Sequence, residues 1–157
     1  MEKKKEESRG KTYTIFVYGT LRNGYRNHYL LEERSRFLGN AKSVCKYTMT
    51  AIEYYEEGEK FAVPLVSKSP QTKILGELYE ISEEVLKDLD ELEGHPKIYT
   101  RKEAEFEIME KNIKKASKET EKESKKIVRA WIYFNEKTKG KINVTSGDFT
   151  IEYPLIE

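Results

Sequence analysis

The sequence predicts an α+β fold in which about six strands form one curved sheet, open or closed, with two short helices beside it. Three observations lead to this prediction. Runs rich in β-branched and aromatic residues recur along the chain of 157 residues, and such runs are typical of strands. Only two segments have the residue pattern expected of helices. Strands and helices do not alternate regularly, which argues against a parallel βαβ sheet.

The length predicts a single domain spanning residues 1–157, since one core of this size can bury roughly two-thirds of the unfolded surface. The 29 Lys and Arg residues nearly balance the 28 Asp and Glu residues, giving a net charge of +1. No overall field therefore favours nucleic acid or a membrane surface as a partner. Residues 1–11 are too charged for a signal peptide, and no run of about 18 apolar residues exists.

Cysteine and histidine usage bears on location and metal binding. Cys45 is the only cysteine, which excludes an internal disulfide and a cysteine-based zinc cluster and favours a reducing, cytoplasmic location. His28 and His95 are the only histidines and are far apart in the sequence. We therefore expect no metal site, and we expect residues 1–11 to form a flexible tail.

The first predicted strand comprises residues 12–18, and its apolar and aromatic side chains fall on both faces, as in a strand buried on two sides. Gly19 ends it. Because glycine lacks a Cβ, it permits positive φ and a close approach of other groups, so the N–H groups of Gly19, Thr20 and Leu21 could point together at an anion or carbonyl. The alternative is an ordinary turn between a strand and a helix.

The next elements are a short helix and a series of strands. Asn27 is a suitable N-cap for a helix over residues 27–34. Pro64 indicates a bulge, an edge or a bend beside a cavity within its strand. The pattern predicts one bent strand or two paired strands at 37–54, a turn at 56–60, a strand at 61–66, a loop at 67–72 and a strand at 73–81.

Residues 82–93 form the clearest predicted helix, with Ser82 as the N-cap and Gly94 as the stop. At about 100° per residue its apolar side chains occupy one arc that should face the core; they are Val85, Leu86, Leu89 and Leu92. Glu93 is the carboxylate that projects into this arc, between Leu86 and Leu89. Burial would raise its pKa towards the range useful for proton transfer. The alternative is that Glu93 turns to solvent at a frayed helix end.

The remaining residues complete the sheet. Residues 98–109 predict a strand buried on the face of Ala104, Phe106 and Ile108, and residues 127–134 predict a core strand. Residues 140–157 read as a C-terminal tail. The segment 110–126 carries charges of both signs and few apolar residues, which indicates a solvated insert. Association of this insert with nucleic acid is a less favoured alternative, since it is not predominantly basic.

Several motifs together resemble the γ-glutamylcyclotransferase-like (AIG2-like) family, and most closely its γ-glutamylamine cyclotransferase branch. They are YGTL at 18–21, FLGNA at 37–41, ILGELYEI at 74–81, LDELEGHPKIYTR at 89–101 and SGD at 146–148. The similarity runs from about residue 13 to residue 134 and includes the SGD motif; the 110–126 insert and both termini lie outside it. The loop and the glutamate block are specific as a pair.

This resemblance implies a small mixed β-barrel with a cavity and short flanking helices. It also implies a substrate-binding loop composed of Tyr18, Gly19, Thr20 and Leu21, and Glu93 as the proton acceptor. The implied reaction releases 5-oxoproline and an amine or amino acid from a small γ-glutamyl compound, without a cofactor. The competing hypothesis is a non-catalytic module that keeps the cavity to bind a small ligand or presents the 110–126 insert to a partner.

Overall fold

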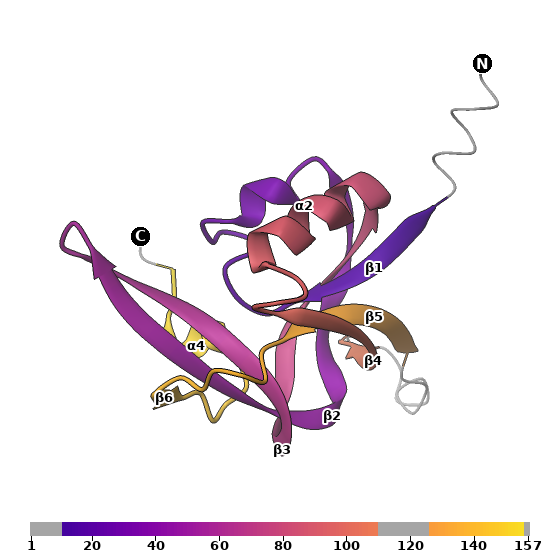
Figure 1. Ribbon diagram of the computed structural model, residues 1–157. Coiled ribbons are helices and arrows are strands. Elements are labelled where there is room, and N and C mark those ends of the chain that lie inside the picture. The colour runs from indigo at the N-terminus through magenta and orange to yellow at the C-terminus, as the bar shows by residue number, and fades with distance from the viewer. Residues whose placement is uncertain (1–10, 110–125, 156–157) are drawn as a thin grey trace, which may run out of the picture.

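The computed structural model describes residues 11–109 and 126–155. Apart from Lys11 and Lys126, the segments predicted as a flexible tail and as a charged insert therefore lie outside the described residues. Figure 1 shows the described elements arranged around one strongly curved sheet, with helix α2 (Glu83–Glu93) lying across its outside.

The sheet closes into a barrel of five strands, and a sixth strand lies outside it. The ladder runs β3-β1-β5-β4-β2, and pairing of β2 with β3 closes it. The β1–β5 pairing is parallel and the others are antiparallel, so the predicted mixed barrel is confirmed. The strands are β1 (Thr12–Val17), β2 (Ser35–Glu56), β3 (Glu59–Ser82), β4 (Thr100–Ile108), β5 (Lys126–Phe134) and β6 (Ile142–Asn143).

Strands β2 and β3 form one long hairpin that reaches beyond the barrel (Figure 1). The prediction of two separate strands joined by a loop at 67–72 is wrong, because the chain stays extended through β3. Residues 68–71 lie between the register pairs Thr48–Ser67 and Tyr47–Thr72 and so form a bulge. The hydroxyl of Thr48 donates to the carbonyl of Ser69 at 2.6 Å and fixes it. Polar side chains at such a bulge resemble those of a loop.

Strand β1 is buried on both faces, as predicted. Phe16 belongs to the cluster inside the barrel and stacks on Phe106 with ring centroids 4.1 Å apart. Ile15 and Val17 belong to a second cluster between the barrel wall and α2. Because both clusters pack on this strand, its C-terminal end is held in a fixed position between the barrel interior and the helix.

Helix α2 begins and ends as predicted. The Ser82 hydroxyl accepts a hydrogen bond from Val85 N at 3.2 Å, and Gly94 adopts the left-handed conformation with φ 66°. Leu89 is fully buried, but Leu92 is 42% exposed, so the expectation that Leu92 faces the core is wrong. Leu92 lies at the edge of the apolar arc, whereas Glu93 lies well inside it.

The segment 27–34 contains only the 3-10 helix η1 (His28–Leu30), and Asn27 does not cap it. The Asn27 side-chain amide instead donates to Thr20 Oγ1 at 2.8 Å, and its backbone N–H donates to the Thr20 carbonyl at 3.0 Å. Asn27 therefore supports the loop after β1.

The predicted C-terminal tail contains β6 and a short helix, α4 (Phe149–Glu152).

Candidate active site

The YGTL loop, residues 18–21, leaves β1 directly beside Pro64 of β3. A Cβ on Gly19 would lie 2.4 Å from Pro64 Cγ and 2.9 Å from its Cδ. Gly19 is not among the described glycines with positive φ. The need for glycine therefore comes from the close approach of the proline ring and not from a left-handed backbone. The sequence had suggested both a positive φ and a close approach at Gly19, and only the close approach is found.

In this loop the carbonyl groups of Gly19 and Thr20 accept hydrogen bonds, whereas the N–H groups remain available to a ligand. The carbonyls of Gly19 and Thr20 accept hydrogen bonds from Arg22 N at 2.9 Å and Asn27 N at 3.0 Å. Among the described residues, no acceptor contacts the N–H groups of Gly19, Thr20 or Leu21. Open backbone donors of this kind suit a carbonyl oxygen or an anion.

Glu93 lies at the end of α2 and lines the same cavity as the YGTL loop. The residue as a whole is half-buried, and burial raises the pKa of its carboxyl group to about 7. Within the part of the chain that the structure describes, its carboxyl group has no hydrogen-bond or ion-pair partner. A carboxyl group of this kind can accept and return a proton near neutral pH.

Three tyrosines complete the wall around Glu93. The hydroxyl of Tyr18 donates to the Tyr133 carbonyl at 2.7 Å, and the hydroxyl of Tyr99 donates to the Pro64 carbonyl at 2.8 Å. Burial raises the pKa of all three hydroxyls, so they are neutral and act as fixed walls. The cavity, of about 40 Å³, is lined by Phe16, Val17, Tyr18, Gly19, Thr20, Leu21, Val63, Pro64, Glu93, Tyr99 and Tyr133.

The structure thus brings together every residue that the sequence nominated for the site, and their roles stay predictions. Two further residues, Tyr99 and Tyr133, also line the cavity. Arg101, the last residue of the motif that contains Glu93, does not line it.

Asp90 is a supporting residue that the helix pattern missed. Its carboxylate accepts from Arg101 Nε at 2.7 Å, from a second Arg101 nitrogen at 3.0 Å and from the Tyr133 hydroxyl at 2.7 Å. Although burial opposes ionisation, these hydrogen bonds hold the pKa of Asp90 below its usual value. Asp90 therefore ties α2 to β4 and β5, which fixes the position of Glu93. Asp90 lies outside the apolar arc of the helix, and its partners come from β4 and β5, which the helix pattern does not show.

Neither a metal cluster nor a membrane-spanning helix is found in residues 11–109 and 126–155. No group of three or more His, Cys, Asp and Glu side chains there could hold a metal ion. No helix in these ranges is long and apolar enough to cross a membrane.

The raised pKa of Glu93 predicts that this residue costs stability at high pH. Its pKa rises from an ordinary 4.5 to about 7 on folding, so the folded state retains a proton that the unfolded state has lost. The contribution of this bound proton to the free energy of unfolding is complete below pH 4.5 and is lost as the pH rises through 7. Glu93→Gln should therefore raise the free energy of unfolding at pH 8 by up to about 3 kcal/mol. Urea denaturation at pH 5 and pH 8 measures this, with Glu91→Gln on the exposed face as the control; equal values for Glu93→Gln and the parent at pH 8 would contradict it.

Comparison with known proteins shows which family the chain belongs to. The fold and the candidate site are those of a small mixed-barrel protein with a half-buried carboxyl group beside an open backbone loop. The profile of the family described as "Gamma-glutamyl cyclotransferase, AIG2-like" matches residues 15–151. The chain belongs to this family, as its motifs indicated.

The most informative relatives span most of the chain. A protein of Methanocaldococcus jannaschii named "Putative gamma-glutamylcyclotransferase MJ1514" is 36% identical over 137 residues, covering 86% of this chain and 93% of its own. The gamma-glutamylaminecyclotransferase of Bos taurus is 31% identical over 102 residues, covering 61% of this chain and 57% of its own. The crystal structure of an AIG2-like protein from Mus musculus has a TM-score of 0.65 at 22% identity, covering 87% of this chain and 88% of its own, and supports the fold.

Proposed function

We propose that this protein is a γ-glutamyl cyclotransferase that releases 5-oxoproline and a free amine or amino acid from a small γ-glutamyl compound. The observation that carries the proposal is the pairing, in one cavity, of a carboxyl group whose pKa is about 7 with the open N–H groups of the YGTL loop. Family membership supports the same reaction class.

Each group has a defined part in the proposed reaction. The Glu93 carboxylate accepts a proton from the α-ammonium of the substrate. The freed amine attacks the side-chain carbonyl carbon, and the N–H groups of the YGTL loop donate to the oxygen that becomes negative. The Glu93 carboxyl then returns this proton to the departing nitrogen as the original amide bond breaks. The carboxylate next accepts the second proton that the ring nitrogen loses on becoming an amide and passes it to the released amine, which leaves as an ammonium ion. The products are a five-membered lactam and a free amine, with no net change in protons or electrons.

The raised pKa reduces the energetic mismatch of the first step. An α-ammonium with a pKa of about 7.7 to 8.0 is some 3.5 units above an ordinary glutamic acid, which corresponds to about 5 kcal/mol. With a pKa of about 7, the Glu93 carboxylate is only about one unit too weak a base, or about 1.4 kcal/mol. The remaining task is to hold the substrate in a cyclic conformation, for which orientation can supply about 7 to 11 kcal/mol.

The size of the cavity limits how the substrate can lie. A cavity of about 150 Å³ can hold a benzene ring, whereas the cavity beside Glu93 has only about 40 Å³. The reacting atoms can reach it, but the rest of the substrate has to extend past the YGTL loop. Bound substrate should therefore contact both the cavity and the surface beyond Thr20.

A panel of γ-glutamyl amines and γ-glutamyl amino acids, followed for 5-oxoproline, tests the proposal. Release of 5-oxoproline from at least one member is the expected result. Binding of panel members without turnover of any would reject the enzyme and favour the non-catalytic module that the sequence left as the alternative.

The pH dependence of turnover follows from the pKa of Glu93. Because the carboxylate is the active base, kcat/KM should fall about tenfold per pH unit below the pKa, that is, below about pH 7. Initial rates between pH 5 and pH 9 measure the profile. A flat profile across pH 5 to 7 would show that a group other than Glu93 accepts the proton.

A further inference from the structure

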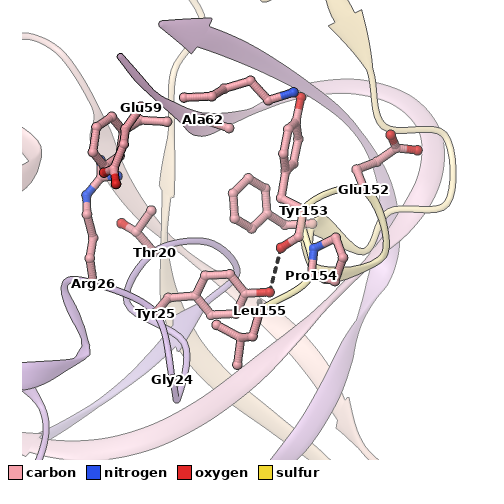
Figure 2. Close-up of a pocket in the computed structure, with 13 residues that line it drawn as sticks. Thr20, Gly24, Tyr25, Arg26, Glu59, Ala62, Glu152, Tyr153, Pro154 and Leu155 are labelled. Atoms are coloured by element: carbon pink, nitrogen blue, oxygen red, sulfur yellow. Dashed lines mark hydrogen bonds between the residues drawn. The ribbon is translucent and has the colours of Figure 1, made fainter. Parts of the chain in front are cut away.

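A second, much larger pocket of about 590 Å³ lies on the other side of Thr20 from the cavity that holds Glu93. Thr20 lines both spaces, and Ala62 of the large pocket is followed along β3 by Val63 and Pro64 of the small cavity. Figure 2 shows Thr20 beside Arg26 and Tyr25 in this pocket. The two spaces are therefore neighbours that share one wall.

The wall of the large pocket is aromatic and held by hydrogen bonds. Its rings belong to Tyr25, Phe61, Phe149 and Tyr153. The hydroxyl of Tyr25 donates to the Tyr153 carbonyl at 2.7 Å, the contact dashed in Figure 2, and the hydroxyl of Tyr153 donates to Glu53 at 2.7 Å. Because the Tyr25 and Tyr153 rings are held by these hydrogen bonds before any ligand binds, they offer apolar surface at a low cost in conformational entropy.

The ring faces also contact one another in ordered geometries. The Phe149 and Tyr153 centroids are 5.0 Å apart, and Tyr25 lies 5.8 Å from Phe149. Phe61 carries the Arg26 guanidinium 4.8 Å above its ring. Such arrangements favour a further aromatic ring over an aliphatic group of the same size.

The charges around the pocket cancel. Arg26 and Lys60 line it together with Glu59 and Glu152. Lys60 lies 3.6 Å from Glu53 as well. A rim with no net charge neither attracts nor repels a carboxylate strongly, so the aromatic wall decides which ligands bind.

We propose that this pocket binds the amine part of the substrate and selects amines that carry an aromatic ring, with or without a carboxylate. The assignment rests on the proposed function, since the amide bond to be broken must lie between Glu93 and the YGTL loop. The small cavity cannot enclose the whole substrate, and Thr20 is the shared wall beyond which the departing amine finds space. The substrate class is therefore γ-glutamyl arylalkylamines and γ-glutamyl aromatic amino acids.

Calorimetric binding to the Glu93→Gln protein, which keeps the ligand intact, tests the pocket without relying on turnover. Three ligands differ only in the amine: γ-glutamyl-2-phenylethylamine, γ-glutamyl-2-cyclohexylethylamine and γ-glutamylethylamine. We expect the phenyl compound to bind at least about tenfold more tightly than the ethyl compound, and about threefold more tightly than the cyclohexyl compound. In parallel, 5-oxoproline release from the phenyl compound is measured with the parent protein.

Two substitutions test whether the preference for the phenyl compound arises in this pocket. Phe61→Ser removes one ring from the pocket and should reduce the phenyl-to-ethyl affinity ratio about threefold or more. Tyr55→Ser is the matched control, because Tyr55 is an aromatic residue of the same hairpin that is 66% exposed and does not line the pocket. It should leave the ratio unchanged.

The possible outcomes distinguish failure of the amine subsite from failure of the proposed reaction. Equal affinities for the phenyl and ethyl compounds overturn the amine subsite, and equal affinities for the phenyl and cyclohexyl compounds overturn its aromatic preference. Selective phenyl binding, lowered by Phe61→Ser, together with no 5-oxoproline from any compound of the panel, supports the subsite and rejects the proposed enzyme. Failure of all three compounds to bind overturns the amine subsite, whereas the reaction itself is decided by the wider panel of γ-glutamyl compounds.

Discussion

Glu93→Gln is expected to reduce the release of 5-oxoproline by about 10² to 10⁴-fold, the range over which a positioned acid or base contributes to catalysis. The amide has the same shape as the carboxyl group but cannot accept the proton of the α-ammonium. Since the carboxyl group has no partner among the described residues, the substitution breaks no recorded contact, and the fold should persist. Initial rates at saturating substrate measure the effect.

The matched control for this substitution is Glu91→Gln. Glu91 lies on the same helix and is exposed, so its loss changes the charge of the helix without touching the cavity. Circular dichroism and thermal denaturation establish that both variants are folded. Activity of Glu93→Gln within tenfold of the parent would remove Glu93 from the mechanism.

Gly19→Ala is expected to impair both stability and turnover. Its Cβ would lie 2.4 Å from Pro64 Cγ, a separation that real Cβ atoms do not tolerate, so the loop or the proline must move. Overpacking of this kind costs about 1 to 3 kcal/mol of stability. Displacing the loop by about 1 Å should also reduce turnover about 100-fold, because the backbone donors lose their alignment with the reacting carbonyl. Urea denaturation and initial rates measure the two effects.

Gly140→Ala separates these effects from simple destabilisation. A Cβ on Gly140 would lie 2.3 Å from the Ala51 carbonyl oxygen, which is a comparable clash, but Gly140 lines neither the cavity nor the large pocket. Gly140→Ala should therefore lose stability and keep the turnover of its folded fraction. Adding Pro64→Ala to Gly19→Ala should restore part of the lost activity; if the double variant is no better, contact with Pro64 does not determine the loop position.

Most of the fold could be predicted from the sequence, because its signals are local. The apolar run of β1, the capped helix α2 and the period-two pattern of β4 each appear in a short window, and family motifs supplied the closure of the barrel. The loop at 67–72 was wrong because a bulge and a loop expose similar polar side chains, and only the register with β2 distinguishes them.

The sequence could predict the position of a site residue where a single helix or strand determines that position. The inward direction of Glu93 follows from helix geometry alone. By contrast, the partners of Asp90 come from β4 and β5, and two of the tyrosines around Glu93, Tyr99 and Tyr133, come from the residue before β4 and from β5. Such contacts between distant segments leave no periodic pattern. Asn27 shows the same limit, since its side chain supports Thr20 instead of capping the helix that follows it.

The pairing around β1 has a consequence for the motions of the barrel. A continuous ladder joins β1 to β3 from Thr12 to Val17, whereas a single register pair, Ile15 with Trp131, joins it to β5. Opening fluctuations should begin at this short seam, where amide hydrogens would exchange with solvent fastest. Because β3 also carries Pro64, the YGTL loop and that wall would then move together away from Tyr133, once the hydrogen bond from the Tyr18 hydroxyl to the Tyr133 carbonyl has broken.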